Sequence, residues 1–398
     1  MDFTFSEDQE SLRGLAAKIF DDQATPERTK AVEDRGEAFD AELWAALADA
    51  GLLGLCLPEG VGGGGYGLIE LGILLQEVGR HVARVPLLAS VALGALPLAR
   101  FGHTPAHDAL LRGVSEGRVV LTGAFDEAGG ADPLRPTTTA SPEGDGWRLE
   151  GCKVAVPYGP QAHRVVVSAV LPDGPAALFL VDPTVPGAQM APATSTTGEP
   201  LGQLTMTGTL VGPEDRLGAG DDQPLPWAYQ RAVAGLCAEA AGVLEGGLRI
   251  TTDYIGQRQQ FGRALASFQG PAMRIADAYI DTQAVGVTTW SAIWRLQEGL
   301  PADEALAMAK FWVADGGQRA QTVLIYLNAD YTGGGTCFSR LGLHVKPGRG
   351  DLLHFHNLGA DGLGHKDTLH AGMPVITGEK WLLSQWIRSE RYPARLAW

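Results

Sequence analysis

The spacing of apolar and polar residues divides the chain into four stretches, in which helical spacing and strand-like alternation follow each other in turn. Up to about residue 115, apolar residues recur every three or four positions, which predicts helices, and Ser6 is a good N-cap for the first one. From about Val119 to Gly218 short alternating runs lie between Pro, Gly and Asp turns, which predicts a small β-barrel or sandwich. Helical spacing returns from Trp227 to about residue 316, and alternating runs follow it. The pattern predicts an α+β multidomain protein.

Three helices are predicted in the second helical stretch. They run from Trp227 to Gln257, from Met273 to Leu296, and onward from Pro301. The glycines of the first are Gly235, Gly242, Gly246 and Gly247. Because each glycine costs a helix roughly 1 kcal/mol against alanine, they predict close contact with a neighbouring helix. A fourth helix normally covers the apolar stripe of such a bundle, and the pattern after residue 316 does not predict one.

Charge, apolar runs and cysteine spacing indicate which partners and which compartment the protein has. The 398 residues carry a formal net charge of −15, which argues against nucleic acid as the main partner. No apolar run approaches the roughly 18 residues that span a bilayer. The N-terminus lacks the basic and apolar regions of a secretory signal. Four widely spaced cysteines have no metal-type spacing, which indicates free thiols and a cytoplasmic protein without a membrane span.

The candidate ligand-binding residues follow the longest predicted helix. Arg258 carries a planar guanidinium that can pair with a pyrophosphate or a carboxylate. Phe261 and Gly262 place a flat ring beside a residue without a side chain, which lets another group approach closely. A helix C-terminus with a cationic cap and a glycine stop explains the same residues equally well.

The run from Cys237 to Gln269 resembles the helix and loop that carry the Arg-x-x-Phe-Gly signature of acyl-CoA dehydrogenases. The resemblance implies that Arg258, Phe261, Gly262 and Gln269 bind the FAD of a neighbouring subunit. The order of helical, β and helical stretches is the layout of that family. It implies an N-terminal helical domain, a middle β-barrel domain and a truncated long-helix bundle, at residues 1–117, 118–220 and 221–316.

The middle stretch carries a second, partial match to the same family. Thr122 and the Gly151-x-Lys153-x-x-Val156 run fall where the family lays its middle domain along the flavin, so the resemblance implies that Thr122 binds the cofactor. The family's Trp and Ser/Thr pair after this strand is replaced here by Val156-Pro157-Tyr158-Gly159. The family reaction is the α,β-desaturation of an acyl-CoA thioester, in which a carboxylate removes the α-proton and a hydride passes to FAD.

A catalytic carboxylate is not found by this resemblance, so the catalytic residues stay unknown. One family position lies in the C-terminal helical segment, which is replaced here. Counting back from Arg258 puts the other at Ala232, beside Gln230-Arg231. Glu239 and Glu245 lie on the same helix, although the Cys-Ala-Glu pattern of Glu239 indicates a structural role. Some relatives work as two-subunit pairs in which one partner lacks the base, which implies a homo- or hetero-oligomer with an impaired or helper subunit.

Residues from about 317 to 392 resemble the C-terminal half of a prolyl 4-hydroxylase-type iron(II)/2-oxoglutarate dioxygenase. The matching residues are Tyr326-Leu-Asn328, Tyr331-x-Gly333-Gly-x-Thr336-x-Phe338, Lys346-Pro-x-x-Gly350-Asp351, Leu369-His370-Ala-Gly372-x-Pro374-Val375 and Gly378-Glu-Lys380-Trp381. The resemblance implies a partial double-stranded β-helix over residues 317–398. It also implies that His370 is the last iron ligand and that Lys380 pairs with the far carboxylate of 2-oxoglutarate.

Such an iron site needs two histidines and a carboxylate on one face of the metal. The family's upstream His-x-Asp strand is replaced here by dehydrogenase-like helix. His365-Lys366-Asp367 matches the His-x-Asp pattern but lies only five residues from His370. We therefore interpret this match as a coincidence and not as the pair of iron ligands. The sequence therefore predicts a chimera, in which a dehydrogenase-like part and a dioxygenase-like part join between Ala314 and Leu324. Three functions follow: an FAD-dependent acyl-CoA dehydrogenase-like oxidoreductase, an iron(II)/2-oxoglutarate dioxygenase, or a non-catalytic fusion product.

Overall fold

The computed structural model describes residues 4–129, 132–172, 174–195, 198–218 and 222–317, and after residue 320 only the strands β11 to β18 whose bounds are given below. Contacts divide the chain into two units, Met1–Val313 and Ala314–Trp398.

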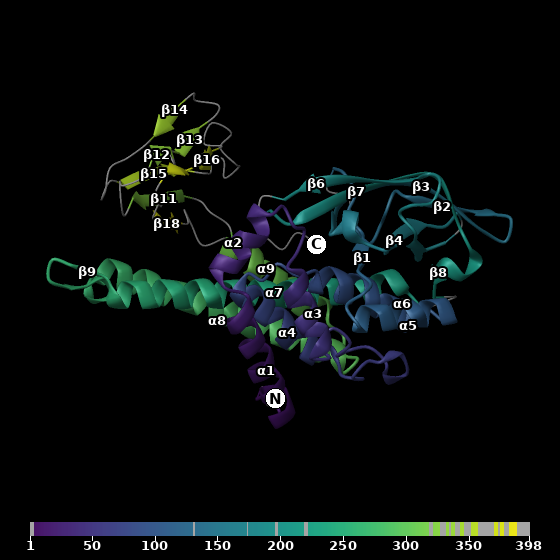
Figure 1. Cartoon of the computed structure of the whole chain (residues 1–398), viewed down its shortest axis with the longest axis horizontal. Coiled ribbons are helices and arrows are strands. Elements are labelled where there is room, and N and C mark those ends of the chain that lie inside the picture. The colour runs from purple at the N-terminus through teal and green to yellow at the C-terminus, as the bar shows by residue number, and fades with distance from the viewer. Residues whose placement is uncertain are drawn as a thin grey trace. The chain divides into compact units, whose positions relative to one another are not determined.

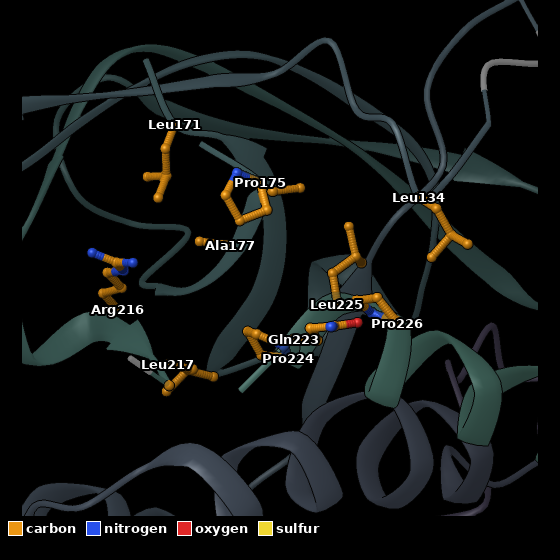
Figure 2. Close-up of a pocket in the computed structure, with 12 residues that line it drawn as sticks. Leu134, Leu171, Pro175, Ala177, Arg216, Leu217, Gln223, Pro224, Leu225 and Pro226 are labelled. Atoms are coloured by element: carbon orange, nitrogen blue, oxygen red, sulfur yellow. The ribbon is translucent and has the colours of Figure 1, made fainter. Parts of the chain in front are cut away.

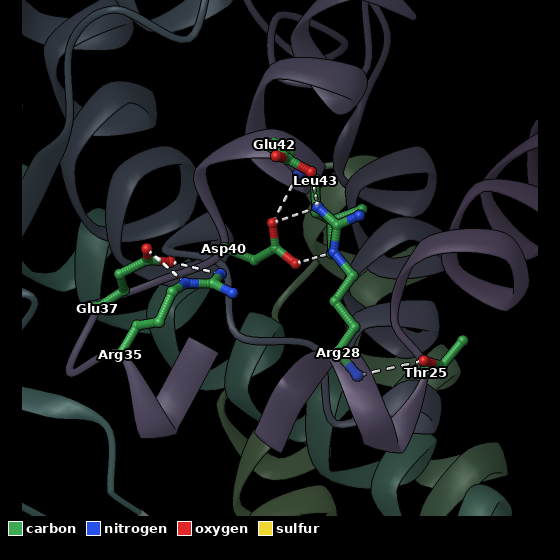
Figure 3. A network of polar contacts seen from close by, with 7 residues as sticks. All are labelled: Thr25, Arg28, Arg35, Glu37, Asp40, Glu42 and Leu43. Atoms are coloured by element: carbon green, nitrogen blue, oxygen red, sulfur yellow. Dashed lines mark hydrogen bonds and ion pairs between the residues drawn. The ribbon is translucent and has the colours of Figure 1, made fainter. Parts of the chain in front are cut away.

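Helices form the first part of the larger unit (Figure 1). They are α1 (Glu7–Gln23), α2 (Pro26–Asp34), α3 (Ala41–Asp49), α4 (Leu68–His81), a π-helical segment (Leu88–Ala95), α5 (Leu96–Phe101) and α6 (Pro105–Ser115). Ser6 caps α1 as predicted, because its hydroxyl accepts from the N–H of Gln9 and the Gln9 side chain accepts in return. Asp40 caps α3 and is held by the guanidinium of Arg28 at 2.5 and 2.7 Å (Figure 3).

One sheet forms the middle of the larger unit. Its strands are β1 (Leu121–Ala124), β2 (Thr139–Glu143), β3 (Gly146–Pro157), β4 (Arg164–Val170), β5 (Ala176–Val181), β6 (Ala188–Thr194), β7 (Pro200–Val211) and β8 (Arg216–Leu217). Their order is β6-β7-β3-β2-β4-β5-β8, and β1 pairs with β4 in parallel. Val165 and Val167 pack inside this β domain, whereas Val166 joins the core of the helical part. Both faces of β4 are therefore buried, which explains its continuous apolar run.

Long helices return after the sheet. They are α7 (Pro224–Gln257), α8 (Gln269–Gln297) and α9 (Asp303–Gly317), with the short pair β9 (Gln259–Gln260) and β10 (Arg263–Ala264) between α7 and α8. The glycines of α7 were predicted to mark a close helix contact. A Cβ at Gly242 would overlap the carbonyl oxygen of Gln76 on α4, and one at Gly246 would overlap that of Arg80. The prediction is confirmed for these residues and is wrong for Gly247, which has open space around it.

The smaller unit contains short antiparallel strands. They are β11 (Gln321–Tyr326), β12 (Thr332–Gly333), β13 (Thr336–Phe338), β14 (Leu343–Val345), β15 (Leu352–His356), β16 (His370–Gly372), β17 (Val375–Thr377) and β18 (Leu382–Ile387). They pair in the orders β15-β11-β18, β14-β13-β16 and β12-β17. The change from helix to strand after residue 317 agrees with the sequence pattern. No helix within the described ranges is long and apolar enough to cross a membrane.

Candidate functional site

Three cavities follow one face of α7, and neighbouring cavities share wall residues. The first has a volume of about 300 Å³ and shares Leu134 and Pro226 with the second, of about 230 Å³. The second shares Tyr229, Val233 and Lys310 with the third, of about 420 Å³. The α7 residues that line them run from Pro224 to Cys237. At 1.5 Å per residue, the row extends along roughly 20 Å of the helix.

The first cavity combines apolar walls with positive charge. Figure 2 shows Arg216 on the side of the β domain, and Gln223 with Pro224 at the start of α7. The guanidinium of Arg216 lies 5.2 Å from the centre of the Trp147 ring, which holds it over the indole. The N-terminus of a 34-residue helix adds a partial positive charge. This cavity suits the anionic end of a larger ligand.

The third cavity is mainly apolar and is closed on one side by the β domain. Gly123 and Phe125 from the end of β1, with Val154 and Ala155 from β3, form that wall. Thr122, predicted to bind a cofactor, is buried, and its hydroxyl donates to the carbonyl of Pro157 at 2.6 Å. This hydrogen bond joins β1 to the end of β3.

A buried ion pair fixes the same wall. Lys153 Nζ lies 2.7 Å from Glu127 Oε1 and donates to Ser168 at 2.9 Å. Glu127 also accepts hydrogen bonds from the backbone and hydroxyl groups of Thr137 and Thr138. Although burial acts in the opposite direction, these donors hold the pKa of Glu127 well below its ordinary value. Lys153 therefore has a structural role that its place in a family motif did not reveal.

The candidate bases differ in position. Ala232, found by counting back from Arg258, lines the third cavity, so that position offers only a methyl group there. Glu245 accepts from Gln76 at 2.6 Å and from Arg80 at 2.5 Å, and it serves the contact between α4 and α7. Burial raises the pKa of Glu239 to about 8, and its Oε2 has no hydrogen-bond partner among the described residues. The carboxylate that lines the third cavity is Asp126, which the sequence reasoning did not single out.

The structure brings the Arg-x-x-Phe-Gly residues together at the other end of α7 (Figure 1, beside β9). Arg258 ends the helix, and Phe261 and Gly262 form the turn between β9 and β10. Phe261 is 93% exposed and has a φ of 53°, which is strained for a residue with a Cβ. Gln269 begins α8 and is exposed. Arg258 lies 26 residues beyond Ala232, roughly 39 Å along the helix axis, so these residues cannot share a ligand with the cavities of the same chain.

Of the residues predicted for the dioxygenase site, His370 begins β16, where its backbone pairs with Phe338. Lys380 lies outside the described residues, as do His365 and Asp367. No group of three or more His, Cys, Asp or Glu side chains that could hold a metal occurs among the described residues.

Comparison with known proteins identifies the family of most of the chain. The family models for the acyl-CoA dehydrogenase N-terminal domain and C-terminal domain match residues 6–118 and 228–323. Acyl-CoA dehydrogenase FadE27 of Mycobacterium tuberculosis is 35% identical over 336 residues, which are 82% of this chain and 88% of the relative. The resemblance read from the Arg-x-x-Phe-Gly run is confirmed at the level of the family.

Solved structures agree with this assignment. A variant of the steroid ACAD Tcur3481–Tcur3483 is 42% identical with a TM-score of 0.73, covering 78% of this chain and 84% of that one. The ChsE4–ChsE5 complex from Mycobacterium tuberculosis is 37% identical with a TM-score of 0.75, covering 80% and 85%. The family models end at residue 323 and do not support the dioxygenase resemblance of the later residues. From residue 6 to about residue 323, the chain is a member of the acyl-CoA dehydrogenase family.

Proposed function

We propose that this chain is the helper subunit of an FAD-dependent acyl-CoA dehydrogenase and binds an acyl-CoA thioester along α7. A second subunit would supply the carboxylate base for α,β-desaturation. The row of three neighbouring cavities, which share wall residues, carries this proposal. Coenzyme A presents its acyl group at the end of a long arm that starts from a phosphorylated nucleotide, and the row has matching chemistry at each end.

Each cavity would take one part of the ligand. Arg216 favours the phosphorylated end in the first cavity, because guanidinium groups bind phosphate oxygens. The dipole of α7 adds to this positive charge, although Pro224 and Pro226 have no N–H to donate. The narrow second cavity would hold the arm between Leu134 and Tyr229. The third would take the acyl group, since apolar walls such as Leu88 and Leu236 favour a hydrocarbon.

We propose that the ring of a flavin would lie against the wall of the third cavity that the β domain forms, beside the acyl group. The cavity volume of about 420 Å³ lies within the usual range for small-molecule sites, and Val154, Ala155 and Pro157 present an apolar wall. When bound, the flavin of this family accepts the hydride. The wall residues would exclude water and orient the ring by packing. Pro157 has no N–H to donate, so FAD would receive no backbone hydrogen bond from this residue.

Two features of α7 support a partner subunit: the missing carboxylate at the cavity and the exposed turn at the C-terminal end of the helix. The position counted back to Ala232 has no carboxylate, and the exposed Arg258–Gly262 turn lies too far from the chain's own cavities to serve them. One similar structure is a complex of two differently named chains, ChsE4 and ChsE5. We propose that Arg258, Phe261, Gly262 and Gln269 contact the FAD of such a neighbouring chain.

Calorimetric titration of the purified full-length chain with acyl-CoA tests the proposal. Because one similar structure is described as a steroid ACAD, a steroid CoA thioester is the second ligand to try beside a short acyl-CoA. We expect saturable binding of a CoA thioester without bleaching of any flavin bands in the visible spectrum. Failure of both thioesters to bind would refute the proposal, and full bleaching by the chain alone would refute the helper role.

Replacing Ala232 by glutamate tests the missing base directly. A carboxylate at this wall position would come within reach of an α-proton in the third cavity. We expect Ala232→Glu to start exchange of that proton with deuterated water, measured by mass spectrometry of the thioester, with a gain of about 100-fold or more over the unaltered chain. Ala240→Glu on the same helix is the matched control and should leave exchange unchanged. Equal exchange by both variants would contradict the assignment.

A second candidate function concerns the residues after 317. The observation that favours it is the antiparallel strand set that includes β13 and β16, with His370 at the start of β16. We infer that an iron(II)/2-oxoglutarate site would need a second histidine and a carboxylate from outside the family pattern. Stoichiometric iron with 2-oxoglutarate-dependent oxygen uptake would support this function, and metal-free protein that ignores 2-oxoglutarate would favour a non-catalytic fusion segment.

A further inference from the structure

Two histidines of the smaller unit lie two positions apart on β15. This strand reads Leu352-Leu353-His354-Phe355-His356 and lies at one edge of the order β15-β11-β18. Because successive residues of a strand alternate between its two faces, His354 and His356 share one face, and Leu353 and Phe355 share the other. At about 3.3 Å per residue, the Cα atoms of the two histidines are roughly 6.6 Å apart.

The register of the sheet places a third polar residue on the face of the two histidines. Across the ladder between β11 and β15, His356 is opposite Gln321 and His354 is opposite Val323. Residues directly opposite each other on antiparallel strands share a face, and their Cα atoms are about 4.5–5.5 Å apart. Gln321 is therefore the neighbour of His356 on the adjoining strand, whereas Thr322, opposite Phe355, belongs to the other face.

A histidine pair with this spacing is suited to a transition-metal ion. Imidazole nitrogen is a good ligand for Zn²⁺, Cu²⁺ and Ni²⁺, and the Zn–N bond is about 2.0–2.1 Å long. Two ring nitrogens on a tetrahedral ion are therefore about 3.3 Å apart, a separation that two histidines on neighbouring positions of one strand face can reach. Because one strand fixes both residues, binding of the first histidine brings the second to the ion at high effective concentration.

We propose that His354 and His356 together bind one divalent transition-metal ion at the edge of this sheet, beside Gln321. This inference is independent of the proposed helper function, which concerns the larger unit. It also differs from the dioxygenase pattern, because His370 lies on β16 in the separate order β14-β13-β16.

Titration of the untagged full-length chain with zinc sulfate, followed by calorimetry, tests the proposal. His354→Ala and His356→Ala should each weaken zinc binding by about 100-fold or more, because loss of a ligand should exceed the 10–100-fold that loss of a supporting residue costs. Gln321→Ala should weaken it less. His344→Ala on β14 is the matched control and should leave the affinity unchanged. Unchanged zinc affinity in both β15 variants would overturn the proposal.

A competition experiment checks the chemical class of the ion. Magnesium in large excess should not displace zinc, because Mg²⁺ prefers oxygen ligands and histidine supplies nitrogen. Displacement of zinc by magnesium would show that carboxylates or carbonyl groups hold the ion, and this result would contradict the assignment to His354 and His356.

X-ray absorption spectra of the unaltered, zinc-loaded chain count the ligands without any substitution. We expect two imidazole ligands, with oxygen in the remaining positions. A sulfur ligand would overturn the inference, because it would place the ion at Cys337, which is opposite His344 in the ladder between β13 and β14. Loss of zinc binding in His370→Ala would also overturn it, because the ion would then lie in the dioxygenase pattern. A chain that binds no zinc refutes this site alone, since acyl-CoA binding is measured separately.

Discussion

The middle of α7 and its C-terminal end differ in what they contact. Near its middle, Gly242 brings the helix so close to α4 that a side chain would overlap the carbonyl oxygen of Gln76. At its C-terminal end, Phe261 is almost fully exposed in a strained turn. The buried contact is complete within one chain, whereas the exposed turn presents a large apolar ring to solvent.

Residues in the middle of α7 therefore stabilise the subunit itself, whereas the residues of the exposed turn are available to contact another protein chain. An exposed phenylalanine in the left-handed region costs free energy and contributes little packing to its own chain, apart from an edge contact with Phe268 at 6.2 Å between ring centres. Strain of this kind usually marks a functional position. Substitutions in the middle of α7 should therefore affect stability, and substitutions at the exposed turn should affect binding to a partner.

The largest effect is expected at the contact between α4 and α7. Gly242→Ala should lower the free energy of unfolding by about 3 kcal/mol, because the two helix backbones must move apart. Gly247→Ala on the same helix has open space and should raise it by about 0.5–1 kcal/mol. Urea denaturation of both variants measures the difference. The same sign for both substitutions would contradict the close contact.

A second effect at the buried contact depends on pH. The pKa of Glu239 is raised by burial to about 8, against about 4.3 in an unfolded chain. Between these values the folded state holds a proton that the unfolded state has lost, so stability falls as pH rises, by at most about 1.4 kcal/mol per pH unit. Glu239→Gln cannot titrate. Its free energy of unfolding, relative to that of the unaltered chain, should therefore increase from about pH 5 to pH 8 and stay constant above pH 8.

Denaturation curves at pH 5, 6, 7 and 8 check this dependence. Glu298→Gln, at an exposed position after α8, is the control and should follow the unaltered chain at every pH. A constant difference between Glu239→Gln and the unaltered chain across the series would show that Glu239 stays ionised in the fold.

The smallest change in stability, with a separate change in binding, is expected at the exposed turn. Phe261→Gly should raise the free energy of unfolding by up to about 1 kcal/mol, because glycine adopts a φ of 53° without strain. The same variant should retain less flavin when assembled with a partner subunit, measured by absorbance. Gly262→Ala should lower the free energy of unfolding, because the φ of 77° at this position is strained for alanine. A Phe261→Gly chain that is less stable would show that the ring serves its own subunit.

Local features were predictable from the sequence. The capping box at Ser6 needs only residues three positions apart, and the Arg-x-x-Phe-Gly run is continuous along the chain. The glycines of α7 predicted a close contact correctly, although the sequence alone did not separate Gly242 from Gly247. That distinction depends on which face of the helix meets α4, and only tertiary packing decides it.

The cavities were not predictable in the same way. Their walls combine Leu134 from a loop, Arg216 from an edge strand and Lys310 from α9, and no local pattern connects these residues. The hydrogen bond of Thr122 was also beyond the sequence, because its partner Pro157 lies 35 residues further along the chain.

One helix carries the α7 walls of all three cavities, the contact with α4 and, at its end, Arg258. A residue inserted into an α-helix rotates everything beyond it by about 100° relative to everything before it. An insertion after Pro226 would therefore turn Tyr229 and Val233 away from the cavities and move Gly242 off α4. Evolution can exchange side chains along α7 one at a time, but any change in its length would have to be compensated at every one of these contacts together.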